Sequence, residues 1–157
     1  MTGLTAIKGW LPHRYPMLLV DRVVDLVAGE RLTAQKAVTC AEPCYQSLPD
    51  DAPESRYDYP SMLLLESWCQ SAGILAVAGE PCPAGVVLMF GRMSGVRFTG
   101  RVRPGDVVDH RARQVRAMAG TTVLTGESLV AGAVVMEVGS VMITRSAVLT
   151  IDGGSAA

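Results

Sequence analysis

The chain has 157 residues, a formal net charge of -1, and 49% hydrophobic against 18% charged residues. This composition is too apolar and too weakly charged for an intrinsically disordered protein, and the length suits one domain with a core of its own. Twelve arginines and two lysines stand against 15 acidic residues. The chain therefore has no overall positive field, and we expect no nucleic-acid partner.

The spacing of the cysteines and the hydropathy of the chain indicate the cellular location that we expect. Four cysteines are present, at Cys40, Cys44, Cys69 and Cys82. They form no Cys-x-x-Cys pair and no basic, apolar signal sequence opens the chain, so we expect reduced thiols and a location in the cytoplasm. The longest apolar stretch, residues 62–78, is interrupted by Glu66 and Gln70 and is shorter than the ~20 residues that cross a bilayer. It predicts a core helix and no membrane span.

The N-terminal third predicts three short elements and a loop. Residues 4–11 are amphipathic and end at a proline, which indicates a short cap. Residues 17–28 are rich in Val and Leu, and residues 31–40 alternate between apolar and polar, so the pair predicts a β-hairpin around a Gly-Glu turn. Residues 41–60 contain four prolines and five acidic residues. We expect a long loop without a regular element there.

The rest of the chain predicts one helix followed by strands. Residues 61–78 are apolar around nearly the whole helical circumference, which is typical of a buried helix. Strand-like runs follow at residues 86–98, 106–117, 121–132 and 134–146. An antiparallel sheet with one helix against its face accommodates this order, which gives an α+β fold class. We expect a single domain over residues 1–150 and a flexible C-terminal tail over residues 151–157.

Four segments resemble the motifs of a known family. They read LPHRYPMLLVDRV (residues 11–23), EPCYQ (42–46), LLLESWCQSAG (63–73) and VRFTGRVRPGD (96–106). In this order the chain resembles the FabZ-type (3R)-hydroxyacyl-ACP dehydratases. The resemblance implies the hot dog fold, in which a curved antiparallel sheet wraps a long central helix and two subunits join their sheets edge to edge. It also implies an active site at the dimer interface, where a loop His of one subunit faces a helix Glu of the other.

The predicted helix carries the acidic half of that site. Glu66 stands at the position of the family's catalytic Glu, and Gln70 matches the family's Gln one helical turn later. Because residues i and i+4 share a helix face, Gln70 can hydrogen-bond to Glu66 and orient it. Backbone N–H groups near Ser61, at the positive end of the helix, can hold a thioester carbonyl. The residues alone leave open that Glu66 is merely paired with an arginine at an interface.

The loop lacks the family's histidine. Alignment from the EPCYQ segment puts Leu48 at the His position, and alignment backwards from the helix puts Ala52 there. The chain has two histidines. His13 falls in a segment that the resemblance places away from the catalytic pair, and His110 falls in a strand, where we expect it on the sheet surface. We therefore predict that this chain lacks the general base of the dehydration.

The resemblance also suggests where substrate and carrier would bind. We predict that Tyr45, Met62 and Phe98 line an acyl tunnel, and that Arg97 and Arg101 dock an acidic acyl carrier protein bearing an acyl-phosphopantetheine. An ordinary solvated strand face is the open alternative for the two arginines. The acidic loop has no His or Cys at ligand spacing, so we expect no metal site, and no cofactor.

The sequence is compatible with three functions. The leading hypothesis is a subunit of a heteromeric 3-hydroxyacyl-ACP dehydratase of fatty-acid or type II polyketide or polyene type. This chain would supply Glu66 and rely on a homologous subunit for the His. Such a chain would be weak or inactive alone. The second is a homodimeric acyl-thioesterase that uses Glu66, because other hot dog proteins are thioesterases with a helix carboxylate. The third is a non-catalytic acyl-ACP binding protein.

Overall fold

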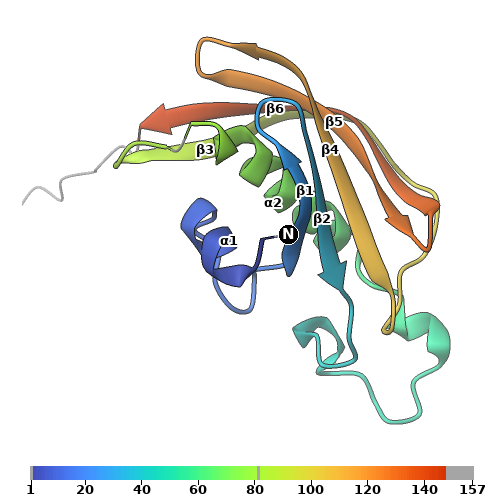
Figure 1. Cartoon of the computed structure of the whole chain (residues 1–157). Coiled ribbons are helices and arrows are strands. Elements are labelled where there is room, and N and C mark those ends of the chain that lie inside the picture. Colours follow the sequence, from blue (N-terminus) through green and yellow to red (C-terminus); the bar gives the residue numbers. More distant parts are fainter. Residues whose placement is uncertain (1, 81, 148–157) are drawn as a thin grey trace, which may run out of the picture.

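A curved antiparallel sheet wraps around one long helix (Figure 1). The computed structural model describes residues 2–80 and 82–147, so the predicted tail over residues 151–157 lies outside the described residues. Its elements are α1 (Leu4–Trp10), β1 (Arg22–Val27), β2 (Arg31–Ala37), the 3-10 helices η1 (Pro43–Tyr45) and η2 (Glu54–Tyr57), α2 (Ser61–Ala78), β3 (Val86–Phe98), β4 (Val107–Met118), β5 (Thr121–Val130) and β6 (Ala133–Ala147). The strand order is β1-β2-β4-β5-β6-β3. This is the hot dog fold, and the α+β prediction is confirmed.

Two sequence expectations about local structure are wrong. The first strand begins at Arg22 and not at residue 17, because the N–H of Leu19 donates to the side chain of Gln70 and not to a neighbouring strand. The loop over residues 41–60 contains η1 and η2. Proline favours both short turns, since Pro43 occupies the first turn of η1 and Pro53 precedes η2.

Two-residue turns connect β4 to β5 and β5 to β6. The β4–β5 connection is Ala119-Gly120 and the β5–β6 connection is Ala131-Gly132, and all four residues have positive φ. Two consecutive residues of positive φ are the signature of the two-residue turn whose twist matches that of the flanking strands. Both connections are therefore tight two-residue hairpin turns.

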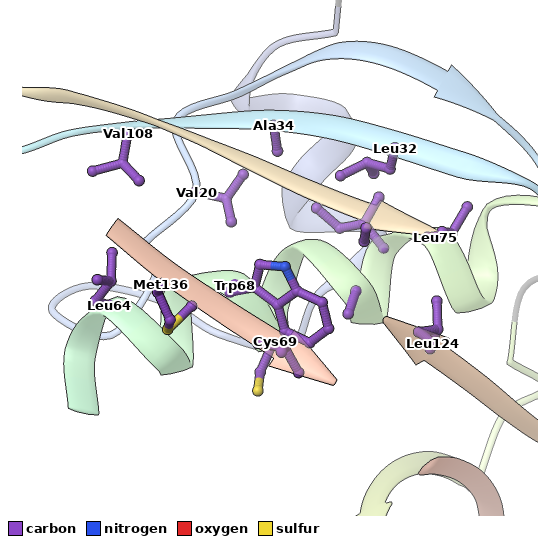
Figure 2. Packing of buried hydrophobic residues seen from close by; sticks show 14 of the residues in the cluster. Val20, Leu32, Ala34, Leu64, Trp68, Cys69, Leu75, Val108, Leu124 and Met136 are labelled. Carbon is purple, nitrogen blue, oxygen red and sulfur yellow. The ribbon is translucent and has the colours of Figure 1, made fainter. Parts of the chain in front are cut away.

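The core lies between α2 and the concave face of the sheet. Trp68 is fully buried at its centre and is surrounded by residues of α2 and the sheet, among them Leu64, Leu75, Leu124 and Met136 (Figure 2). Its indole N–H donates to the carbonyl of Arg111 on β4 at 3.0 Å. α2 is therefore buried on several sides, as its apolar circumference predicts.

One segment is long and apolar enough to cross a membrane by length and composition alone. It spans residues 54–78 and includes α2, and 61% of its most apolar window is buried inside the domain. Its apolar surface is therefore used mainly for packing against the sheet.

Candidate active site

A cavity of about 790 Å³ opens beside α2. Residues 8–14 form one wall, at the end of α1 and in the turn after it, and residues 86–93 of β3 form another. α2 contributes side chains at helical spacing, including Met62, Glu66, Gln70, Gly73 and Val77. Among the described residues, Glu66 is the one acidic side chain that lines the cavity.

Gln70 fixes the Glu66 carboxylate from one helical turn away. Its Nε2 donates to Glu66 Oε1 at 2.9 Å and to the carbonyl of Met17 at 2.7 Å, while its Oε1 accepts from the N–H of Leu19 at 2.9 Å. The amide is almost fully buried, and all of its donors are used. Glu66 itself is 36% exposed toward the cavity. The carboxylate is thus held in place and still accessible to a substrate.

His13 contradicts the sequence-based expectation about its location. The segment was predicted to lie away from the catalytic pair, but His13 Nε2 lies 3.4 Å from Glu66 Oε1, and both residues line the cavity. The cause is a turn that folds residues 11–17 back over α2. Leu11 is buried beneath it, Met17 N–H donates to the Arg14 carbonyl, and Gln70 holds the Met17 carbonyl. These contacts are not local in the sequence, which is why motif position alone missed them.

His110 also differs from expectation. It was predicted on the sheet surface, but it is fully buried and faces α2. Val108 and Ala112 are buried on the same face of β4. Because strand residues two apart point to one side, this alternation is a signal that could have placed His110 correctly.

Two cysteines, Cys69 in the cavity wall and Cys44 in η1, have thiols that are not activated. Burial, with a smaller contribution from the Glu66 charge, raises the pKa of Cys69 to about 12. Burial likewise raises the pKa of Cys44, and the nearby Glu42 adds to that shift. Because the thiolate is the nucleophilic form, neither cysteine is suited to covalent catalysis at neutral pH.

The two loop positions predicted to stand in place of the family histidine, Leu48 and Ala52, do not line the cavity of their own subunit. Leu48 packs against the core and its N–H donates to the Tyr45 carbonyl, while the Ala52 N–H donates to the Pro49 carbonyl. Neither side chain is ionisable, so this loop offers no base at either position. This observation underlies the hypothesis that a homologous subunit supplies the histidine to a shared site, which stays a prediction.

The other predicted site residues are only partly brought together. Met62 lines the cavity, whereas Tyr45 is buried with its hydroxyl donating to the Tyr57 carbonyl, and Phe98 is exposed near the end of β3. At the start of α2, the N–H groups of Leu63 and Leu64 both donate to the Pro60 carbonyl. A thioester oxygen would therefore have to use the N–H groups of Ser61 and Met62.

The two predicted docking arginines are exposed but already have acidic neighbours. Arg97 pairs with Glu137 at 2.8 Å, and Arg101 lies 3.3 Å from Asp58, which also accepts from Arg103. Exposed ion pairs of this kind are weak and can exchange for another acidic partner. Their docking role stays a prediction.

No group of three or more His, Cys, Asp or Glu side chains within residues 2–80 and 82–147 is arranged to hold a metal ion. Within the cavity, the Glu66 carboxylate accepts a hydrogen bond from Gln70 and lies close to His13.

Comparison with known proteins assigns the family. A family model described as a FabA-like domain matches residues 11–139. The chain belongs to this family. Relatives named 3-hydroxyacyl-acyl-carrier-protein dehydratase FabZ match over most of their length: that of Actinobacillus pleuropneumoniae is 41% identical over 135 residues, covering 85% of each chain. That of Thiobacillus denitrificans is 40% identical over 134 residues, covering 83% of this chain and 89% of its own.

Solved structures show the same fold at low identity. A chain of the dehydratase heterocomplex ApeI:P from Xenorhabdus doucetiae is 17% identical, with a TM-score of 0.71 over 89% of this chain and 90% of its own. A hypothetical thioesterase of Streptococcus pneumoniae with coenzyme A is 12% identical, with a TM-score of 0.60 over 82% of this chain and 88% of its own. These likenesses support the fold of this FabA-like member.

Proposed function

We propose that the chain is a subunit of a 3-hydroxyacyl-acyl-carrier-protein dehydratase in which Glu66 is the general acid. The observation that carries the proposal is the placement of Glu66 as the one acidic lining residue of the described cavity, fixed by a donor from Gln70. The curated FabZ relatives, at about 40% identity along most of the chain, support the same reaction class.

The reaction removes water from a 3-hydroxyacyl thioester. A base takes the proton from the α-carbon, the resulting electron pair forms the double bond, and the hydroxyl leaves with a proton from the Glu66 carboxyl as water. The N–H groups at the start of α2 would stabilise the negative charge on the thioester oxygen. The products are a 2-enoyl thioester and water, and the proton on the base returns to Glu66 through solvent.

The base is the missing part, and we propose that a partner subunit supplies it. Leu48 and Ala52 stand where the family's loop histidine would be, and neither can accept a proton. A homologous subunit with an intact loop His could place it against Glu66 across a shared interface. Support comes from the ApeI:P chain, because a dehydratase described as a heterocomplex has the same fold.

His13 provides a specific second candidate. Its Nε2 lies 3.4 Å from Glu66 Oε1 within one subunit, so the chain could hold both an acid and a base in one cavity. In that case the protein would be active without a different partner. The two candidates predict opposite results for the isolated chain.

The decisive experiment measures enoyl formation from a 3-hydroxyacyl carrier protein, with the chain alone and with a homologous subunit that bears the loop His. The proposal expects the chain alone to be slower than the mixture by at least about 10²-fold, the usual contribution of one acid or base. Equal activity of the chain alone, lost in His13→Ala, would replace the partner by His13.

Glu66→Gln tests the acid in the active assembly. It keeps the shape of the side chain but cannot supply the carboxyl proton, so we expect the dehydration rate to fall by about 10²–10⁴-fold. Glu30→Gln, at an exposed carboxylate in the β1–β2 turn, is the matched control and should keep the rate. Release of free thiol that depends on Glu66 would show a thioesterase instead, and stoichiometric acyl-carrier binding without turnover would show a binding protein.

A further inference from the structure

A buried polar network lies between α2 and the sheet, outside the cavity. His110 on β4 is fully buried, and so are Ser67 on α2 and Ser128 on β5. None of the three lines the cavity, and the proposed dehydration uses none of them. Burying polar groups in an apolar core costs free energy unless each finds a partner. Each of the three side chains therefore needs a hydrogen-bond partner within the core.

The hydrogen bonds define one tautomer of His110. Ser67 Oγ donates its single proton to the Leu19 carbonyl at 2.9 Å, so toward His110 Nε2, at 2.8 Å, it can only accept. Nε2 therefore carries the ring proton. Nδ1 then accepts from the hydroxyl of Ser128 at 2.7 Å. The result is a directed chain of donors from Ser128 through His110 and Ser67 to the Leu19 carbonyl.

The Leu19 residue is held from both sides of its backbone. Its carbonyl accepts from Ser67, and its N–H donates to Gln70 Oε1 at 2.9 Å. Ser67 and Gln70 are three residues apart on α2, so both reach the same segment of chain. The position of this segment is thereby fixed to α2 at two points.

The same segment decides how the Gln70 amide is turned. Because Oε1 accepts from the Leu19 N–H, Nε2 must face the other way, where it donates to Met17 O and to Glu66 Oε1. A flipped amide would bring Nε2 against the Leu19 N–H and the amide oxygen against the Glu66 carboxylate. The orientation of the donor to Glu66 is thus imposed by the Leu19 backbone.

We propose that His110 is a positioning residue for the active site, acting through Ser67, the Leu19 backbone and Gln70 on the carboxylate of Glu66. The catalytic part of this inference rests on the proposed role of Glu66 as the acid, but the chain of hydrogen bonds stands apart from it. His110 belongs to the part of the hydrogen-bond network that lies away from the substrate. Its loss lets the segment around Leu19 move away from α2.

Ser67→Ala breaks the chain at its centre, and Ser71→Ala is the matched control. Both serines are fully buried on α2, and Ser71 Oγ donates only to the Ser67 carbonyl within the helix. In the active assembly, Ser67→Ala is expected to lower kcat about tenfold with KM changed less than about twofold, as for a misplaced catalytic group. Ser71→Ala is expected to keep kcat within about twofold.

His110 itself is tested by a conservative pair. His110→Met fills the space without a donor and should lower kcat as Ser67→Ala does, whereas His110→Gln, whose amide can donate to Ser67 and accept from Ser128, should restore most of it. Thermal unfolding monitors stability in every variant. If kcat follows the unfolding temperature across all four variants, with Ser71→Ala included, the positioning role is refuted.

A spectroscopic measurement separates this proposal from the proposed function. In the full-length protein, the side-chain amide signals of Gln70 in a ¹⁵N–¹H spectrum report its hydrogen bonds whether or not the protein dehydrates anything. We expect these signals to move in Ser67→Ala and His110→Met and to stay in place in Ser71→Ala. Unchanged Gln70 signals in the first two variants would overturn the network, while moved signals without any dehydration would overturn only the function.

Discussion

His110 is a histidine that stays neutral at physiological pH. Burial is the main cause, with the charge of Lys36 as a smaller one, and together they lower the pKa of His110 to about 3. Lys36 is itself paired with Glu42 at 2.5 Å under the loop. The imidazole therefore acts as a fixed donor and acceptor, and not as a proton carrier, while the protein is folded.

This pKa makes stability depend on acidity in a defined direction. An unfolded histidine titrates near 6.5, so below that pH the unfolded chain binds a proton that the folded chain refuses. The contribution is fully present above pH 6.5 and is lost as pH falls toward 3. From pH 7 to pH 5 we expect this group to cost about 2 kcal/mol of the free energy of unfolding.

Urea unfolding of the wild type and of His110→Met at pH 7 and pH 5 measures that cost. Other titrating groups act in both proteins, so the difference between the two pH dependences isolates residue 110. The wild type should lose more stability on acidification than the variant. Parallel losses would mean that His110 is protonated in the folded state.

At the scale of elements, the crossing of α2 over β4 and β5 depends on one small residue. A Cβ atom on Gly126 of β5 would overlap the Arg111 carbonyl oxygen and lie 2.9 Å from the Trp68 indole ring. That carbonyl is the acceptor of the Trp68 indole N–H. The absence of a side chain at Gly126 is what lets the central tryptophan approach the sheet.

Gly126→Ala is therefore expected to destabilise the fold by about 2–4 kcal/mol, as an overpacked core site whose neighbours include backbone. Gly9→Ala is the matched substitution in α1, where nothing lies within 4 Å of the added atom. There the reduced entropy of the unfolded chain should stabilise the protein by about 0.5–1 kcal/mol. Opposite shifts of the urea midpoint would confirm the pair, and a neutral Gly126→Ala would contradict it.

The elements themselves could be predicted well from local patterns. The helix over residues 61–78 and the strand over 86–98 have the bounds given by their sequence periodicity. Contacts between segments far apart in the sequence could not be predicted from these local patterns. Residues 17–21 look like a strand by composition, but the N–H of Leu19 donates to the Gln70 side chain and that of Met17 to the Arg14 carbonyl. His13 lies near Glu66 only because a turn returns over α2. The burial of His110, by contrast, could have been predicted from the alternation of residues along β4.

At the scale of the whole molecule, the sheet ends in two edges, β1 and β3. β3 is 13 residues long and mostly exposed, and it carries the exposed apolar side chains of Val87, Met89 and Phe90 next to the cavity. A long apolar edge strand is a ready template for pairing with another chain. This favours the predicted sheet-sharing dimer and would bring a second subunit close to Glu66.

Met89→Lys tests that assembly, because a charge on the edge opposes strand pairing. Sedimentation at micromolar concentration should show a dimer for the wild type and association weakened by at least about tenfold for the variant. Val115→Lys, at an exposed position on β4, is the control and should leave the dimer intact. A dimer that survives Met89→Lys unchanged would move the interface away from β3.

The support of Glu66 also has a consequence for mutational scanning. Met17 and Leu19 hold Gln70 through a carbonyl and an N–H, so almost any residue type at the exposed position of Met17 offers the same contact. A library of single substitutions would score position 17 as tolerant and leave its role invisible. Replacement of the Leu19 amide by an ester, which deletes one N–H and keeps every side chain, is the change that would reveal it.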